Sequence, residues 1–230
     1  MAVKNSGKKA RRGNAEENAT DRASPKEVHP LNYIQEVYLN AIKTNQVIFG
    51  IGSPGTGKTY VAAAYAAIEL FYRRTGKIIL TRPNVETGRG LGFLPGTLEE
   101  KYAPYLEPFD SVFNRVLGAG FYEHALKSKV IEPRPLGFMR GSTFDDCIVL
   151  VDEAQQATTD ELKMLLTRIG KNCKMILSGD PEQSDLLKES GLEDAANRLE
   201  HIDGIEVVEF LDSDIVRSKM CKEIIMAYRK

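Results

Sequence analysis

Residues 47–59 read Val-Ile-Phe-Gly-Ile-Gly-Ser-Pro-Gly-Thr-Gly-Lys-Thr, and this stretch decides the fold. It begins as a short apolar, β-rich run, Val47–Ile51, and continues as a loop that matches the pattern G-x-x-x-x-G-K-[ST]. An alanine-rich helical pattern follows directly at 58–72. Because a strand leads into the loop and a helix leads out of it, the sequence predicts a phosphate-binding loop (P-loop).

The composition of this loop suits a nucleoside triphosphate such as ATP. Glycines allow successive backbone N–H groups to turn inward around an anion, and the following helix adds the positive end of its dipole. We expect Lys58 to reach the β- and γ-phosphates and to take part in catalysis, and Thr59 to give its hydroxyl to Mg²⁺. The predicted nucleotide-binding residues of the loop are Gly52, Ser53, Pro54, Gly55, Thr56, Gly57, Lys58 and Thr59.

A second apolar run, Cys147–Val151, ends in two carboxylates. Asp152, at the carboxyl end of the predicted strand, is placed to hold the Mg²⁺ ion, which is the Walker B role. Glu153 follows directly and is the candidate general base that polarises the attacking water. A glutamate at this point favours hydrolysis over transfer of the phosphoryl group to a bound acceptor.

The run Met-Ile-Leu-Ser-Gly-Asp-Pro-Glu-Gln follows one strand later, at 175–183. A Gly-Asp-Pro turn by itself explains Gly179 and Pro181. Gln183 suggests more than a turn, because a glutamine near the γ-phosphate can hydrogen-bond both phosphate and attacking water. We therefore take Gln183 as a candidate catalytic residue.

Short apolar runs alternate with helical patterns along most of the chain, which favours an α/β fold with a mainly parallel sheet and helices on both faces. The segment at about 82–146 interrupts this alternation with six of the ten prolines, and we interpret it as an elaborated insertion with helical pieces such as Tyr102–Val116. Strands are predicted at 47–51, 77–80, 147–151, 174–177 and 205–210, and helices at 31–44, 58–72, 159–169, 191–200 and 219–229.

Composition limits the class of protein. The 230 residues are 42% hydrophobic, carry a formal net charge of −1 and contain no apolar run long enough to span a bilayer. Three widely spaced cysteines argue against a disulfide framework and a zinc site. We therefore expect a cytoplasmic protein without a membrane partner.

Residues 1–30 contain too little apolar surface to fold, so the sequence predicts a disordered basic tail ahead of one domain at 31–230. Through Lys26 the tail has seven basic and three acidic residues. It is either a solvated tail or an arm that contacts nucleic-acid phosphates.

Several motifs together resemble the PhoH family from about Leu31 to the C-terminus. They are Leu-Thr-Arg-Pro-Asn-Val-Glu (80–86), Leu-Gly-Phe-Leu-Pro-Gly (91–96), Phe-Met-Arg-Gly (138–141), Val-Asp-Glu-Ala-Gln (151–155), Leu-Thr-Arg-Ile-Gly (166–170) and Asp-Ile-Val-Arg-Ser (214–218). The resemblance implies a RecA-like ATPase core, similar to the first motor domain of superfamily 1 helicases. The short form resembles phage-encoded members, which implies the host cytoplasm, and the family's phosphate-starvation label describes regulation only.

The resemblance also implies particular residues and partners. Gln35 matches a Q-motif glutamine that reads the adenine edge, although an ordinary surface glutamine of a helix is the alternative. Some relatives carry a PIN-type nuclease domain, which thirty polar residues ahead of Leu31 cannot supply, so we expect no nuclease activity.

A superfamily 1 helicase closes its site with an arginine from a second motor domain. We expect a neighbouring subunit of a ring, a hexamer, to supply it here, with Arg217 favoured and Arg140 second. The arginines considered are Arg82, Arg140, Arg168 and Arg217. Two other functions stay open: an ATP-driven motor on RNA or single-stranded DNA, and an ATP-dependent binding switch with little turnover.

Overall fold

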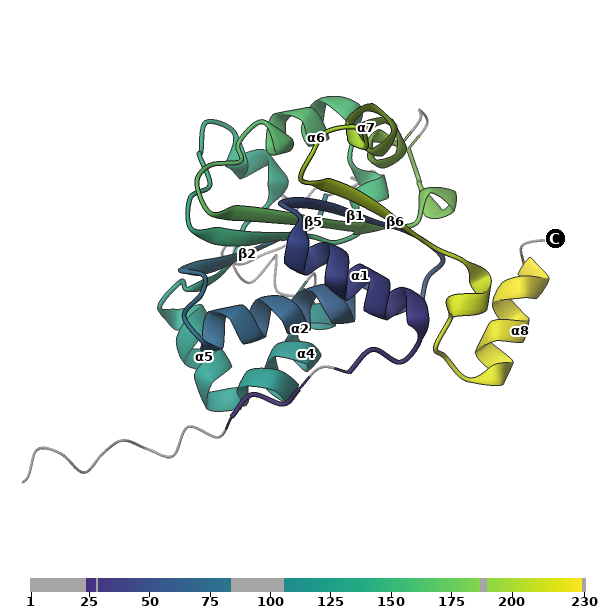
Figure 1. Ribbon diagram of the computed structural model, residues 1–230, viewed down its shortest axis with the longest axis horizontal. Helices are drawn as coiled ribbons and strands as arrows, with labels where there is room; N and C mark the ends of the chain where they lie inside the picture. The colour runs from purple at the N-terminus through teal and green to yellow at the C-terminus, as the bar shows by residue number, and fades with distance from the viewer. Residues whose placement is uncertain (1–23, 28, 84–105, 187–189, 229–230) are drawn as a thin grey trace, which may run out of the picture.

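The computed structural model describes residues 24–27, 29–83, 106–186 and 190–228 (Figure 1). Most of the predicted tail, and residues 84–105 of the predicted insertion, lie outside the described residues.

A six-stranded sheet in the order β3-β2-β4-β5-β1-β6 forms the centre of the fold, and every pairing within it is parallel. The predicted α/β fold with a parallel sheet is therefore confirmed. Its strands are β1 (Val47–Gly52), β2 (Lys77–Thr81), β3 (Ile131–Pro133), β4 (Cys147–Val151), β5 (Cys173–Gly179) and β6 (Ile205–Phe210).

Helices cover both faces of the sheet, as Figure 1 shows. The helices are α1 (Tyr33–Thr44), α2 (Lys58–Phe71), α4 (Glu107–Leu117), α5 (Ala119–Lys127), α6 (Thr159–Leu166), α7 (Gly191–Leu199) and α8 (Lys219–Tyr228). Short 3-10 turns are η3 (Leu136–Met139), η4 (Ala154–Gln156), η5 (Pro181–Gln183) and η6 (Asp212–Asp214). One hydrophobic cluster joins α1, α2, α4 and α5 to the sheet, and the other joins α6 and α7 to its opposite face.

The central strands are apolar because both of their faces are covered. All five residues of β4 are buried, as expected for a parallel strand between two helical layers. On one face the alanines of α2 lie against the sheet, and five of them, at positions 62–64, 66 and 67, are at most 3% exposed. Their small side chains let the helix approach the sheet closely.

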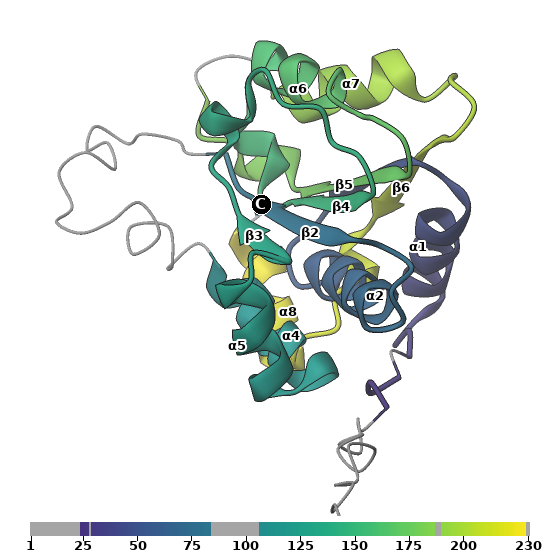
Figure 2. The same ribbon diagram turned by 90° about the vertical axis from the view of Figure 1, so that its left-hand side faces the viewer.

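The described part of the 82–146 segment contributes buried residues to both hydrophobic clusters. Its strand β3 pairs with β2 at the edge of the sheet, and α4 and α5 pack in the cluster that contains α2 (Figure 2). Strand β3 was not predicted from the sequence, because a three-residue strand that ends in Pro133 is too short to show a periodic pattern.

Within the described ranges, no helix combines the length and the apolar character needed to cross a bilayer.

Candidate nucleotide-binding site

The carboxyl ends of β1, β4 and β5 meet at one edge of the sheet, where ligands bind in open parallel α/β folds. A cavity of about 290 Å³ opens there. The predicted site residues that line it are Pro54, Gly55, Gly57, Lys58, Thr59, Asp152, Glu153, Gln183 and Arg217. Residues far apart in the sequence therefore converge on one cavity.

The loop between β1 and α2 has the backbone of an anion cradle. Gly55 and Gly57 have φ angles of 77° and 92°, in the left-handed region that favours glycine. Within this loop the Thr56 hydroxyl donates to the Ser53 carbonyl oxygen at 3.0 Å. The Lys58 ammonium donates to the carbonyl oxygens of Gly52 and Ser53 at 2.6 and 2.7 Å. Lys58 thus holds the loop closed on itself and is only 7% exposed.

The N-terminus of α2 suits a phosphate group. Its N-cap, Gly57, supplies no side-chain acceptor, and the first turn of the helix contains no acidic residue. The first N–H groups of a helix have no partner within the helix, and they carry the positive end of its dipole. A phosphate therefore fits the place that a capping side chain would otherwise fill.

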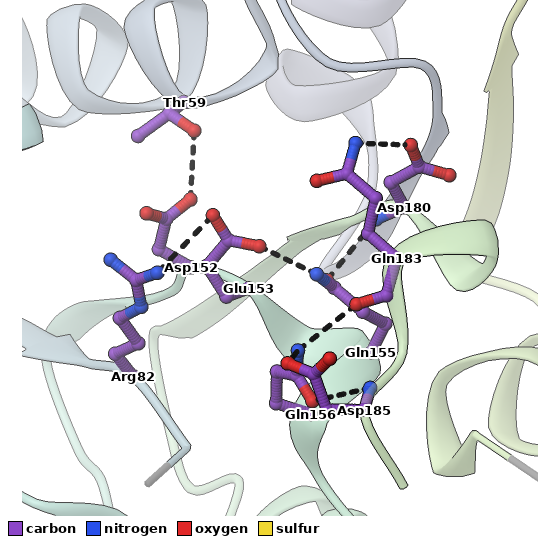
Figure 3. A network of polar contacts seen from close by, with 9 residues as sticks. All are labelled: Thr59, Arg82, Asp152, Glu153, Gln155, Gln156, Asp180, Gln183 and Asp185. Carbon is purple, nitrogen blue, oxygen red and sulfur yellow. Dashed lines mark hydrogen bonds and ion pairs between the residues drawn. The ribbon is translucent and has the colours of Figure 1, made fainter. Parts of the chain in front are cut away.

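Asp152 and Thr59 form the part of the site that suits a divalent cation. The Thr59 hydroxyl donates to Asp152 Oδ1 at 2.8 Å (Figure 3). Burial raises the pKa of the Asp152 carboxyl above its ordinary value, and the bond from Thr59 opposes part of that rise. A cation beside this carboxylate would offset the cost of burying its charge. No group of three or more His, Cys, Asp or Glu side chains in the described ranges forms a metal cluster. The pair thus fits Mg²⁺, which takes one or two protein ligands and keeps phosphate oxygens and water.

Glu153 lies beside this pair and is held at both carboxylate oxygens. Arg82 Nη2 lies 3.3 Å from Glu153 Oε1, and Gln155 Nε2 donates to Glu153 Oε2 at 2.5 Å (Figure 3). The backbone of Glu153 is left-handed, with a φ of 51°, which is uncommon for a residue with a side chain. Such conformations persist where the surrounding structure fixes them, and they cluster at active sites.

Gln183 lies in η5, after β5, and lines the cavity. Its Nε2 donates to Asp180 Oδ2 at 2.9 Å, so the side chain is anchored to its own turn. The side-chain oxygen of Gln183, Oε1, is a further acceptor for a water. The structure thus brings Gln183 to the same cavity as Glu153.

Arg217 lies on the P-loop of its own chain. A Cβ built on Gly55 would lie 2.6 Å from Arg217 Nε, and the Val216 N–H donates to the Gly55 carbonyl oxygen at 3.0 Å. The sequence favoured Arg217 as an arginine that a neighbouring subunit supplies. In the structure it lies beside the P-loop of its own chain, because the segment after β6 returns to that loop, and supply by a neighbour stays a prediction. Arg140 and Arg168 are not among the residues that line the cavity, and Arg82 contacts the cavity residue Glu153.

Gln35 lies behind the loop and not in the cavity lining. Its Nε2 donates to the Thr56 carbonyl oxygen at 2.8 Å, and its Oε1 accepts from the Leu31 N–H at 2.8 Å. A Cβ on Gly57 would lie 2.6 Å from Gln35 Nε2, so the side chain fills the space beneath that glycine. With 2% exposure and both ends of its amide engaged, Gln35 braces the loop and is not a surface glutamine of its helix, and its adenine-reading role stays a prediction.

One residue near the cavity was missed by sequence reasoning. Gln155 is buried and connects Glu153 to the turn after β5. The sequence offered no periodic or motif signal for it beyond its place in the Val-Asp-Glu-Ala-Gln stretch.

A parallel sheet with a phosphate-binding loop after β1 and a buried aspartate after β4 defines the class of P-loop NTPase folds. The chain belongs to the PhoH family, because the family model described as PhoH-like protein matches residues 27–229.

Curated relatives agree with this assignment. The PhoH-like protein of Bacillus subtilis (strain 168) is 46% identical over 217 residues, which cover 94% of this chain and 68% of that protein. Protein PhoH of Escherichia coli (strain K12) is 42% identical over 201 residues, which cover 86% of this chain and 57% of that protein. The PhoH-like protein of Mycobacterium leprae (strain TN) is 44% identical, and 59% of its length is covered. The chain thus spans between 57% and 68% of the length of these relatives.

Among solved structures, the crystal structure of Pif1 helicase from Candida albicans is similar at a TM-score of 0.40 and 16% identity. The match covers 80% of this chain and 41% of that one.

Proposed function

We propose that this protein binds ATP together with Mg²⁺ and hydrolyses it. The single observation that carries the proposal is that Lys58, the Thr59–Asp152 pair and Glu153 line one cavity at the start of α2. Each of these groups has a known type of role in the transfer of a phosphoryl group to water.

Different residues of the site bind the phosphates, hold the metal ion and act on the attacking water. The N–H groups of the loop and the Lys58 ammonium bind the phosphates, and Lys58 exchanges its carbonyl partners for phosphate oxygens. Thr59 and Asp152 would hold Mg²⁺, which would neutralise phosphate charge when bound. Glu153 accepts the proton of the attacking water, Gln183 orients that water, and Arg217 stabilises the charge that develops on the γ-phosphate.

The test separates binding from hydrolysis. Glu153→Gln is expected to keep ATP affinity, measured by titration calorimetry, while phosphate release falls by about 10²–10⁴-fold, the usual contribution of general acid–base catalysis. Glu123→Gln is the matched control, because Glu123 lies on the exposed surface of α5, where it pairs with Lys127. Release of phosphate at the wild-type rate by Glu153→Gln would contradict the proposal that Glu153 is the base.

The same assay distinguishes the other two functions. Tight ATP binding by the wild-type protein without phosphate release would favour a binding switch. Faster turnover with RNA or single-stranded DNA would extend the proposal to a nucleic-acid motor.

A further inference from the structure

The turns that follow β4 and β5 are joined by one buried side chain. Gln155 is 1% exposed, and its amide lies between Glu153 and Asp180 (Figure 3). On one side its Nε2 donates to Glu153 Oε2 at 2.5 Å. On the other side its Oε1 accepts from the Asp180 N–H at 3.1 Å. The same amide therefore contacts the proposed base and the turn that carries Gln183.

The backbone around Gln155 fixes that amide in place. Its carbonyl oxygen accepts from the hydroxyls of Ser184 and Ser190, each at 3.1 Å. Gly179 provides the space, because a Cβ there would lie 2.5 Å from Gln155 Oε1. The glycine that the sequence explained by a turn is thus required for the close approach of Gln155 to β5.

Glu153 needs such a partner because its own side chain has several rotatable bonds. A base contributes fully only when its carboxylate is held within hydrogen-bond reach of the proton that it abstracts. Arg82 contacts one oxygen and Gln155 the other, and each oxygen keeps a lone pair for water. Arg82 supplies charge, whereas Gln155 supplies direction and a rigid connection to β5.

We propose that Gln155 is a positioning residue for ATP hydrolysis, which sets the direction of the Glu153 carboxylate and fixes its distance from Gln183. This inference rests on the proposed function of Glu153 as the base. Gln155 acts through Glu153, because its amide bonds Glu153 and the Asp180 N–H and the residue does not line the cavity.

Two substitutions separate this role from simple structural support. Gln155→Met keeps a similar volume and loses both hydrogen bonds. Gln155→Glu keeps an acceptor for the Asp180 N–H and places a second carboxylate against Glu153. Both are expected to keep ATP affinity and to lower kcat, by about 10–10²-fold for a misplaced catalytic group.

The pH profile gives the readout that a structural role would not change. Two carboxylates in contact cannot both ionise freely, so in Gln155→Glu the acidic limb of the kcat profile moves to higher pH. In Gln155→Met kcat falls without that displacement. Asn197→Ala is the control, because Asn197 is an exposed amide on α7 and does not line the cavity. Its turnover is expected to stay close to the wild-type value.

A double variant tests whether Gln155 acts through Glu153. Adding Gln155→Met to Glu153→Gln should lower kcat little beyond the Glu153→Gln value, because residues that act as a unit are not additive. Multiplied losses would overturn the inference. So would wild-type kcat in Gln155→Met, or loss of ATP affinity at unchanged kcat in both Gln155 variants. If Glu153→Gln itself is fully active, the proposed base is wrong; if it is impaired while Gln155→Met is not, only this inference fails.

Discussion

Replacing Gln35 with leucine tests whether this side chain braces the P-loop or reads the adenine base. The two roles make different predictions, because a brace affects every nucleotide and the stability of the protein, whereas a reader affects the choice between nucleotides. In the structure the side-chain amide of Gln35 is hydrogen-bonded to the Thr56 carbonyl oxygen and to the Leu31 N–H. We therefore expect Gln35→Leu to destabilise the protein and to weaken ATP and GTP binding by the same factor.

The expected loss of stability follows from these two contacts. Thr56 is fully buried, so its carbonyl would lose its partner, which costs about 1–3 kcal/mol. Leu31 is exposed and water can replace the bond to its N–H, so that contact contributes about 0.5–1.5 kcal/mol. Together they lower the free energy of unfolding by about 1.5–4.5 kcal/mol. For a chain of this size the melting temperature should fall by roughly 3–18 °C.

Urea denaturation followed by circular dichroism measures the stability, and calorimetric titration with ATP and GTP measures the selectivity. Asn40→Ala is the control, since Asn40 is an exposed amide on the same helix. A variant that keeps wild-type stability but loses discrimination between ATP and GTP would refute the brace and restore the adenine-reading role.

Three further predictions concern the cavity. Lys58→Ala should abolish measurable ATP binding in calorimetry while far-ultraviolet circular dichroism stays unchanged; wild-type affinity would contradict the P-loop assignment. For Asp152, burial raises the pKa in the folded state above the ordinary 3.8, so without nucleotide the free energy of unfolding should fall as pH rises from 3.8 through the raised pKa. In urea denaturation at a series of pH values, Asp152→Asn should not show this fall. The same pH dependence of the free energy of unfolding in both proteins would show that burying the Asp152 charge does not lower stability. Arg217→Ala should lower turnover by about 10³–10⁵-fold, the usual contribution of such an arginine. Because Arg217 contacts its own loop, mixing this variant with Lys58→Ala should restore no activity, and recovery would instead support an arginine supplied by a neighbour.

The fold was predictable from the sequence because its signals are local. The alternation of apolar runs with helical patterns gave a parallel α/β sheet, and the observed strands agree within a few residues with those expected. The exceptions lie in the insertion, where β3 and α5 were not predicted. A strand as short as β3 is stabilised by its pairing with β2, and no pattern within three residues reports that pairing.

Part of the candidate site was also predictable, for the same reason. Lys58 and Thr59 belong to a run of consecutive residues whose backbone geometry is set by the glycines beside them. Asp152 and Glu153 follow an apolar strand directly, so their place at the edge of the sheet follows from the strand itself. The sequence therefore determined the P-loop, the acidic strand end and the membership of the PhoH family.

Tertiary structure alone decided how separate segments meet at the loop. Gln35 turned out to brace Thr56 from behind, Arg217 returned to its own chain's Gly55, and Gln155 bridged Glu153 to Asp180. Each of these contacts joins segments whose separation in space depends on how helices and strands pack, whereas a sequence pattern reports only neighbours along the chain. A side chain's type and position in the sequence specify what it can bond, and the packing of the whole fold determines which partner lies within reach.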